Sequence, residues 1–409
     1  MHRQAFVTLL LSVLLAAAAQ VRAGEVERWN RVATDAATAE QMDPLNESRV
    51  FAIVHAAIHN ALNAIDRRYE PYRAGVMTVP IGASPEAAAA AAAHASLVGL
   101  MPARKRDFDA ALAGALAQIG NKQAASAGIR VGQEVAAAVL ALRRDDGASR
   151  TVAYTPGKKP GDYRPTPPDF TPAALAQWGA VRPFVLARSA QFRPAPPPAP
   201  ASARARADIE EIRAIGGKAS SVRTTEQSEI ARYWYESSPQ GWNRIAREIA
   251  ASRGLDEWES ARLLALVNFA MADGFIGGFE AKYHYNYWRP ATAIGENGRE
   301  NSDSAWLPYL DTPPVPDYPS THTVLGASAA AVLARFFGTD MVPFSMTSGA
   351  PYGGITRRFW SFSEAAHENG ASRMFAGIHF ASAVRAGYTQ GELIGAWTYE
   401  RALRPVRPD

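Results

Sequence analysis

The sequence predicts an all-α protein, and three observations lead to that fold class. Apolar residues recur at the three-to-four spacing of a helix face, as in VFAIVHAAIHNALNAI at residues 50–65. Ser84, Pro85 and Glu86 stand where a helix start needs an N-cap, a first-position proline and an acidic first turn. Runs of alternating Val, Ile, Thr and aromatic residues, which are typical of strands, are nearly absent.

The same criteria divide the chain into two helical-bundle halves, residues 24–190 and residues 208–409. Further amphipathic runs lie at about 105–145, 225–236, 243–252, 256–282 and from Thr321 onward. The stretch YTPGKKPGDYRPTPPDFTP has the composition of a loop. Residues 191–207, rich in proline and alanine, predict an extended connection over the surface between the halves.

The first 23 residues predict a secretory signal peptide. A short basic start precedes an apolar run of about fifteen residues and a small-residue step that ends at Ala23. The run is shorter than the roughly 20 apolar residues that a membrane-spanning helix needs, so cleavage after Ala23 is favoured over an uncleaved anchor. No later segment is singled out as a membrane span. We therefore expect a periplasmic or secreted protein with no stable membrane insertion after cleavage.

Composition narrows the classes of function. The chain has 409 residues, 47% hydrophobic and 20% charged, as expected for one large or two medium globular domains. Its net charge of +4 falls to +2 without residues 1–23, because Arg3 and Arg22 leave and no acidic residue does. No clustered basic stripe is present, so nucleic acid is not an expected partner. The absence of cysteine excludes disulfides, thiol nucleophiles and thiolate metal sites, so histidine must carry more of the chemistry.

Three histidines in the first half raise the question of a metal site. His55 and His59 lie four residues apart on one helix face, which is the spacing of half a metal site. Their neighbours are alanine, valine and isoleucine, and no acid or third histidine follows at ligand spacing. Buried histidines with a backbone partner are the better interpretation, and the same holds for His94 in its alanine-rich helix.

Lys282 and Arg289, in KYHYNYWRP, are the first of three polar groups in the second half that suit one kind of ligand. At about 100° per residue, a separation of seven brings both side chains within roughly 20° of one helix face. Pro290 is expected to end or kink this helix and to leave Arg289 at a helix end, facing a pocket. Taken alone, the pair would more simply be two surface cations.

The second group is DYPSTHT at residues 317–323, which precedes an apolar helical run. Ser320 or Thr321 can cap that helix, whose first N–H groups and positive dipole end form an anion site. His322, in the first turn, is placed to exchange a proton with an anion held there. A simple N-cap with an exposed histidine is the alternative.

The third group is SRMFAGIHF, in which Arg373 and His379 are six residues apart. On an unbroken helix they would point about 120° apart, so a shared ligand requires a bend, for which Gly377 is the candidate, or an arginine that reaches back. Together the three groups supply one lysine, two arginines, a serine hydroxyl, first-turn amides and two histidines. This set of donors predicts a site for a tetrahedral oxyanion.

These motifs resemble the three-part signature of the vanadium-dependent haloperoxidases and the type 2 phosphatidic acid phosphatases. The order and spacing agree: lysine, six residues, Arg-Pro; then Pro-Ser-x-His; then Ser-Arg, five residues, histidine. Stretches outside the motifs, such as VERWNRVATDAA and EIARYWYESSPQGWNRIAREIA, look like the long secreted bacterial haloperoxidases rather than the compact membrane lipid phosphatases. The resemblance covers nearly all of the chain after residue 23 and implies a haloperoxidase-like fold with its active site in the C-terminal half.

The resemblance also implies a cofactor, vanadate, and a role for each motif residue. The implied vanadate contacts come from Lys282, Arg289, Ser320, the Thr321 amide, Arg373 and His379, the last as direct ligand of vanadium. His322 would manage the proton of hydrogen peroxide, and Lys282 would polarise the bound peroxide for attack by a halide. In the phosphatase version, His379 attacks phosphorus and His322 protonates the leaving oxygen.

Three positions depart from the family pattern. Thr321 replaces the usual glycine between the serine and the histidine, which keeps the amide but adds bulk, so a tighter or reshaped pocket is expected. Ala383 stands where the family commonly has an aspartate that holds the tautomer of the last histidine, so His379 needs another partner, such as a backbone carbonyl. Val315 stands where chloride- and bromide-oxidising relatives carry phenylalanine or histidine, so this position does not indicate which halide is preferred.

The favoured function is a vanadate-dependent haloperoxidase-like oxidoreductase whose partners are hydrogen peroxide and a halide. An exported acid phosphatase that acts on a phosphate ester through a phosphohistidine would use the same pocket and is the alternative. A degenerate oxyanion-binding helical protein without catalysis is a third hypothesis, for which Ala383 is the main argument.

Overall fold

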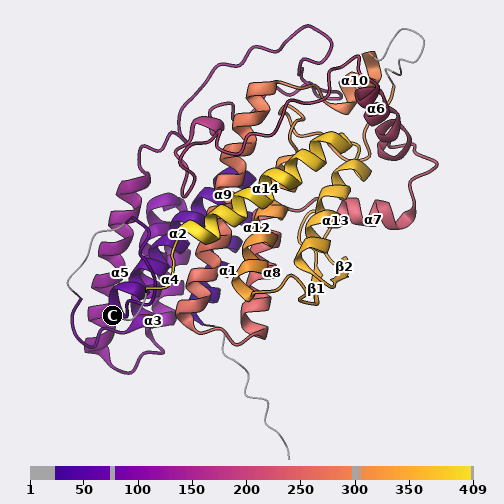
Figure 1. The fold of residues 1–409 in the computed structure, drawn as a ribbon. Helices are drawn as coiled ribbons and strands as arrows, with labels where there is room; N and C mark the ends of the chain where they lie inside the picture. The colour runs from indigo at the N-terminus through magenta and orange to yellow at the C-terminus, as the bar shows by residue number, and fades with distance from the viewer. Residues whose placement is uncertain (1–23, 74–78, 297–302, 304, 407–409) are drawn as a thin grey trace, which may run out of the picture.

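The structure of the chain, a computed structural model, describes residues 24–73, 79–296, 303 and 305–406. The predicted signal peptide, residues 1–23, lies outside the described residues. Figure 1 shows an elongated body in which α1 to α5 gather toward one end and α7, α13 and both strands toward the other. Helices dominate the described residues, so the all-α prediction is confirmed.

The elements follow one another along the chain within these bounds: α1 (Glu25–Ala39), α2 (Pro44–Ile65), α3 (Pro85–Leu100), η1 (Pro102–Arg104), α4 (Lys105–Leu116), α5 (Lys122–Arg143), η2 (Trp178–Ala180), α6 (Ala203–Gly216), α7 (Thr225–Tyr233), α8 (Ser238–Ser252), α9 (Glu257–Tyr285), α10 (Pro290–Glu296), α12 (Thr321–Phe337), β1 (Phe344–Thr347), β2 (Thr356–Phe359), α13 (Phe362–Phe375) and α14 (Ala381–Arg401). The two strands form an antiparallel pair that pairs Phe344 with Phe359.

The helix starts follow the sequence signals. Ser84 caps α3 by accepting a hydrogen bond from the Ala87 N–H, with Pro85 at the first helical position, as predicted. Asp256 and Glu259 form a reciprocal capping box at the start of α9. These caps satisfy backbone donors that a helix leaves unpaired at its first turn.

Small residues bring α3 and α5 into close contact. A Cβ added at Gly132 on α5 would lie only 2.4 Å from the Ala88 carbonyl oxygen on α3, and one at Gly128 would lie 2.3 Å from the Ser84 carbonyl oxygen. The alanine run of α3 is therefore a surface for tight helix packing, since its side chains leave room for the neighbouring backbone.

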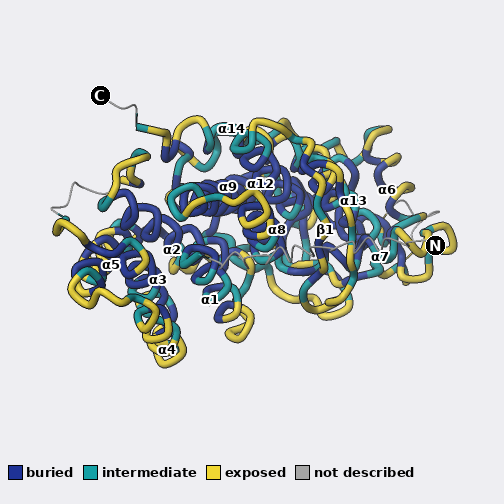
Figure 2. The backbone as a smooth tube through the Cα atoms, turned by 90° about the horizontal axis from the view of Figure 1, so that it is seen from below, coloured by how far each residue is buried: buried dark blue, intermediate teal, exposed yellow. Residues whose placement is uncertain are grey.

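One hydrophobic core joins the two predicted halves. The largest cluster of buried side chains includes Phe51 and Leu97 from the first half and Phe269, Leu325 and Phe362 from the second. Figure 2 shows α2, α9 and α12 buried along much of their length, whereas α4 is largely exposed. In this arrangement α9 is the shared central helix, and its last turn carries Lys282 toward the candidate site.

The proline-rich segment between the halves is extended and held down by polar contacts. The described structure has no helix between η2 and α6. Helix α6 begins at Ala203, so it includes the last five residues of the predicted connection, 191–207. Tyrosine hydroxyls donate hydrogen bonds to successive carbonyls along it: Tyr285 to Pro194, Tyr318 to Ala195 and Tyr287 to Pro198. The segment is therefore a fixed strap over the second half.

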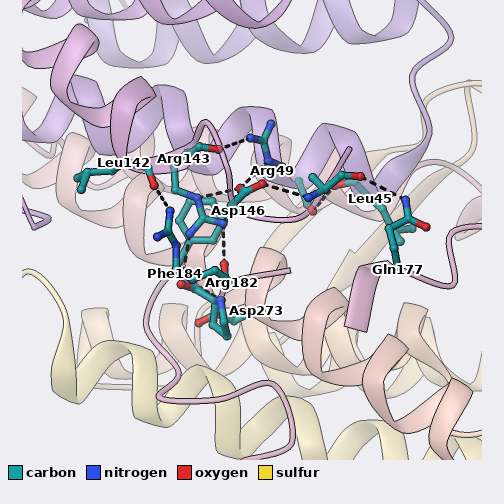
Figure 3. Close-up of polar contacts among 12 residues, drawn as sticks. Leu45, Arg49, Leu142, Arg143, Asp146, Gln177, Arg182, Phe184 and Asp273 are labelled. Carbon is teal, nitrogen blue, oxygen red and sulfur yellow. Dashed lines mark hydrogen bonds and ion pairs between the residues drawn. The ribbon is translucent and has the colours of Figure 1, made fainter. Parts of the chain in front are cut away.

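A buried charge cluster fixes the start of this strap, and Figure 3 shows its members. Asp273 on α9 accepts hydrogen bonds from the N–H groups of Phe184, Val185 and Leu186. Arg143 pairs with Asp146 at 2.9 Å, and Arg49 pairs with the same carboxylate at 2.8 Å. We call Arg49, Arg143, Asp146 and Asp273 the strap cluster.

Two described helices, α5 and α9, are long and apolar enough to cross a membrane by length and composition alone. In α9, 94% of the most apolar window is buried inside the protein, compared with 44% in α5. The apolar character of α9 is accounted for by its place in the core.

Candidate active site

Lys282 lies in the last turn of α9 and is fully buried. Its ammonium donates hydrogen bonds to the carbonyl oxygens of Pro316 at 2.7 Å and Asp317 at 2.9 Å. Burial, and then the positive charge of Arg289, hold the pKa of Lys282 well below its usual value. Neutral carbonyl oxygens therefore hold the Lys282 amine in place. A negative charge bound beside it would raise its pKa and favour the protonated form.

The prediction that Lys282 and Arg289 share one helix face was wrong. The helix ends at Tyr285, and Asn286 turns the chain with a φ of 51°, a left-handed conformation that asparagine tolerates better than most residues. Pro290 does not end α9 but opens α10, where its missing N–H costs nothing. The two cations still converge because both bind the loop before α12, where Arg289 Nε donates to the Val315 carbonyl at 2.7 Å.

The start of α12 lies as predicted, with Ser320 at the N-cap position and Thr321 as first helical residue. The Ser320 side chain does not cap the helix; instead, its oxygen accepts a hydrogen bond from the Thr323 hydroxyl at 2.9 Å. His322 follows in the first turn, and its Nδ1 lies 2.7 Å from Ser238 Oγ. Burial, and then the charge of Arg373, lower the pKa of His322 well below its usual value. The alternative of an exposed, uninvolved histidine is therefore wrong.

A bend brings Arg373 and His379 together, and it lies at Gly377. Helix α13 ends at Phe375, and Gly377 has a φ of 81°. A Cβ there would lie 2.1 Å from the Gly216 carbonyl oxygen, so both conformation and space require glycine. The guanidinium of Arg373 is buried, and it donates to the Trp234 carbonyl at 2.9 Å and to Ser372 Oγ at 3.0 Å.

The motif residues gather around the His379 imidazole. Arg289 Nη1 lies 3.1 Å from His379 Nε2 and donates to the Ile378 carbonyl at 2.7 Å. Burial lowers the pKa of His379 well below its usual value, and the charges of Arg289, Lys282, Arg373 and His322 lower it further, in that order. We call these five residues, together with Asp317 and Ser320, the site cluster. The individual catalytic and ligand roles remain predictions.

Asp317 was missed as a site residue, although it stands in the DYPSTHT stretch itself. Its buried Oδ1 lies 2.8 Å from His379 Nδ1 and 3.9 Å from Arg289 Nη1. Burial raises the pKa of Asp317 to about 7, against the lowering effect of Arg289 and Lys282. The partner of His379 is thus a carboxylate and not the backbone carbonyl suggested from the sequence. The available signal was an acid at the motif's edge together with the missing acid at Ala383.

Ser238 was also missed, and no sequence signal could have found it. It opens α8 and lies 84 residues before His322, whose ring it contacts. Its hydroxyl can donate to one imidazole nitrogen and thereby orient the ring. The corner between α7 and α8 supplies both this hydroxyl and the Trp234 carbonyl that holds Arg373.

The bulk of Thr321 is taken up by a neighbouring helix. A Cβ added at Gly278 on α9 would lie 2.5 Å from Thr321 Cγ2, so the threonine methyl packs where Gly278 leaves space. Thr321 itself is 7% exposed. The family commonly has a glycine at the position of Thr321, beside His322. Here Gly278 on α9 leaves the space that the larger threonine needs.

The histidines of the first half have other partners. His55 Nε2 lies 2.6 Å from Asn30 Nδ2, and burial lowers the pKa of His55 to about 3. His59 Nε2 lies 3.1 Å from the Glu70 carbonyl, the backbone partner that was predicted. His94 contradicts that interpretation, because its Nε2 lies 2.8 Å from the Asp109 carboxylate and forms an ion pair when protonated.

The site cluster is electrostatically unbalanced. Lys282, Arg289 and Arg373 are buried, and the carbonyl oxygens that orient them carry no net charge. Asp317 is the carboxylate that the structure places among them. Fixed cations in a buried site without matching negative charge favour an oxyanion, because its binding relieves their repulsion and accepts their charge-assisted hydrogen bonds.

Comparison with known proteins agrees with this geometry. Residues 262–408 match the family described as the VCPO second helical-bundle domain. The vanadium chloroperoxidase of Curvularia inaequalis is 26% identical over 342 residues, covering 62% of this chain and 56% of that protein. The chain thus spans little more than half the length of that curated relative.

Solved structures extend the similarity over the whole fold. The structure described as the first bacterial vanadium-dependent iodoperoxidase aligns with a TM-score of 0.83 and 27% identity, covering 94% of this chain and 98% of that one. An apo-type bacterial vanadium-dependent chloroperoxidase aligns with a TM-score of 0.73 at 16% identity, covering 88% and 94%, which shows the shared fold. With the three motifs gathered around one imidazole, these similarities support a place in the superfamily of vanadium haloperoxidases and type 2 phosphatidic acid phosphatases.

Proposed function

We propose that the chain is a vanadate-dependent haloperoxidase-like oxidoreductase that uses hydrogen peroxide to oxidise a halide. The observation that carries this proposal is the unbalanced site cluster, in which the buried side chains of Lys282, Arg289 and Arg373 and the start of α12 lie around the neutral imidazole of His379. The names of the chloroperoxidase and iodoperoxidase relatives support the same activity.

The residues present fit a tetrahedral oxyanion such as vanadate. Lys282, Arg289 and Arg373 would hold its oxygens, and Ser320 and the Thr321 amide would add hydrogen bonds at the positive end of α12. His379 has a low pKa, so its imidazole is neutral and carries the lone pair that a metal ligand needs. When bound, vanadate would supply a Lewis-acidic centre that activates hydrogen peroxide toward a halide.

The remaining chemistry falls to two of the chain's own side chains. His322 is neutral, because its pKa is lowered, and is oriented by Ser238, so it can take a proton from hydrogen peroxide as it enters the site. Lys282 donates hydrogen bonds from a fixed position and would polarise the bound peroxide. Both roles need the positions that the surrounding carbonyls and Ser238 already enforce.

The decisive experiment compares two chemistries on one protein. The purified chain, with and without added vanadate, is given hydrogen peroxide, a phenolic or β-diketone acceptor, and chloride, bromide or iodide in separate reactions. In parallel, the same preparations receive a generic phosphate ester. We expect vanadate-dependent halogenation with at least one halide; ester hydrolysis without any halogenation would favour the phosphatase alternative, and neither reaction would favour the non-catalytic one.

Phosphate provides a test of where the oxidation occurs. Vanadate and phosphate present similar tetrahedra, so phosphate should compete with vanadate for the protein and lower the peroxidase activity. Activity that is indifferent to phosphate at tens-fold excess would contradict the assignment of the reaction to the site cluster.

We also propose that residues 1–23 direct export and are removed. Expression of the full chain in a bacterial host, followed by mass measurement of protein released from the periplasm, should give a chain that begins at Gly24. An intact N-terminus on membrane-associated protein would contradict this.

A further inference from the structure

Asp317 occupies a position that is fixed from several sides. It lies three residues before the N-cap Ser320 and is fully buried. Its backbone N–H donates to the Tyr287 carbonyl at 2.9 Å, and its own carbonyl accepts from Lys282 Nζ at 2.9 Å. These contacts place the carboxylate with Oδ1 2.8 Å from His379 Nδ1.

The contacts of the imidazole define where its proton lies. Arg289 Nη1 lies 3.1 Å from Nε2 of His379 and 3.5 Å from Nδ1; because an arginine can only donate, we assign the nearer nitrogen, Nε2, as the acceptor. A neutral imidazole has one N–H, which this assignment puts on Nδ1, the nitrogen that lies 2.8 Å from Asp317 Oδ1. In this tautomer the Nε2 lone pair accepts from Arg289, and a ligand would take it in place of that donor.

In the family, an aspartate at the position of Ala383 commonly holds the tautomer of the last histidine, but alanine carries no charge. Ala383 is fully buried in the first turn of α14, among Tyr287, Trp288 and Phe380, and its carbonyl accepts the Ser320 N–H at 3.0 Å. Without Asp317, the remaining polar contact of the His379 ring in the described structure would be the donor Arg289, because residue 383 has no polar side-chain atom.

We propose that Asp317 is the positioning residue of His379, with the carboxylate moved from the helix after the histidine to the loop before α12. It holds the imidazole with its proton on Nδ1, so that Nε2 carries the lone pair that would bind the oxyanion's central atom. This inference rests on the proposed vanadate site. Asp317 touches the histidine and not the substrate, so it acts through the ligand's orientation and tautomer.

A comparison of vanadate affinity with phosphate affinity distinguishes this positioning role from a purely electrostatic effect of the Asp317 carboxylate. Vanadate would gain a bond to His379, whereas phosphate at rest would be held by charge and hydrogen bonds alone. Asp317→Ala removes a negative charge beside an anion site, so it should leave phosphate affinity unchanged or raise it. The same variant should lower vanadate affinity by about 10- to 100-fold, the usual effect of removing a residue that orients a metal ligand. Equal changes in both affinities would overturn the proposal.

A relocation variant provides the sharpest test. Asp317→Ala combined with Ala383→Asp moves the carboxylate to the family position and should recover most of the lost vanadate affinity. Asp317→Asn, nearly identical in shape, retains an oxygen acceptor and should lose less than Asp317→Ala. If all three variants bind vanadate alike while keeping the wild-type melting temperature, the carboxylate has no positioning role.

The tautomer can be read without any anion. In protein labelled with ¹⁵N-histidine, the His379 resonances, assigned through a His379→Gln variant, should show the proton on Nδ1 in the wild type and a shift toward Nε2 in Asp317→Ala. An unchanged tautomer would overturn the inference even if the wild-type protein binds no vanadate. Failure of the wild type to bind vanadate would instead count against the proposed function, so the two failures are distinguishable.

Discussion

Two buried charge clusters in this protein use the same residue types and differ in how their charge is balanced. In the strap cluster, Asp146 lies between Arg49 and Arg143, and Asp273 accepts three backbone N–H groups. Each of its charged groups has a partner, and the contacts join α2, α5 and α9 to the strap, as Figure 3 shows.

The site cluster holds its cations differently. Arg289 donates to the carbonyl oxygens of Val315, Ile378 and Pro313, and Lys282 to those of Pro316 and Asp317. Carbonyl oxygens fix the geometry of a cation but do not neutralise it. A cluster that is paired throughout stabilises the fold, whereas one with more cations than carboxylates is arranged for a ligand of opposite charge.

The largest effect is expected when the two site histidines, His322 and His379, are replaced one at a time. His379→Ala should abolish tight vanadate retention, because it removes the only predicted direct protein bond to vanadium. His322→Ala should leave vanadate bound while lowering turnover by about 10²- to 10⁴-fold, the contribution of a positioned acid/base group. Vanadate affinity and turnover measured for both variants check this, and the reverse pattern would exchange the two assignments.

Matched arginine variants test the contrast between the clusters directly. Arg143→Met leaves a carboxylate buried at 1% side-chain exposure with one partner fewer, so we expect a loss of about 3 to 5 kcal/mol in the free energy of unfolding, with phosphate affinity unchanged. Arg373→Met removes a cation whose nearby charge, Arg289, has the same sign. It should cost little stability but weaken phosphate binding by about 30-fold, the value of one charge-assisted hydrogen bond.

Denaturant unfolding and phosphate titration of the two variants give the four numbers required. Similar losses of stability in both variants would break the comparison. A loss of phosphate binding in Arg143→Met without unfolding would show that the strap cluster contributes to the site.

Glu47 is a third kind of buried charge, held by neutral donors alone. Its carboxylate contacts Ser237 Oγ and Gln240 Nε2, next to the Ser238 that orients His322. Burial raises the pKa of Glu47 from 4.5 to about 7, and Asp43 raises it further, whereas the two hydrogen bonds lower it. A raised pKa means that the folded state binds the proton more tightly than the unfolded state.

Stability should therefore fall as the pH rises from about 4.5 to 7, by up to about 3 kcal/mol from this group. Glu47→Gln, which is neutral at all pH values, should flatten the unfolding free energy across that window. Parallel pH profiles of the wild type and the variant would show that Ser237 and Gln240 compensate the charge fully.

The part of the site that the sequence predicted is the part that lies within short motifs. The helix start at Ser84 and the bend at Gly377 follow from local conformational preferences of those residues, whereas α12 starts at the predicted place without a side-chain cap from Ser320. The shared helix face of Lys282 and Arg289 failed because the left-handed turn at Asn286 outweighed the helical pattern. Local rules predict the elements and miss a single residue that redirects the chain.

Contacts across the fold could not be predicted from one sequence. Ser238 reaches His322 because the α7–α8 corner packs over the start of α12. Asp317 could be paired with His379 only after the loop before α12 was placed beside the turn after α13. Such pairs depend on how elements pack, for which a single sequence carries no periodic signal.

The smallest predicted effect concerns the packing that holds the Thr321 amide, a proposed contact of the oxyanion, in place. The position of the Thr321 amide depends on how its side chain packs against α9. Gly278→Ala would add a Cβ 2.5 Å from Thr321 Cγ2. Overpacking of this kind costs about 1 to 3 kcal/mol, from which the better helix propensity of alanine recovers up to about 1 kcal/mol.

Thr321→Ser is the matched control, because it removes the clashing methyl and keeps both hydroxyl and amide. In that background Gly278→Ala should be neutral or stabilising, so a double-mutant cycle should give a coupling energy of about 1 to 2 kcal/mol. Phosphate affinity should fall a few-fold in Gly278→Ala and return in the double variant, because the displaced amide returns with the lost clash. If stability couples but phosphate affinity does not change, the Thr321 amide does not contact the anion, and the site cluster alone determines its binding.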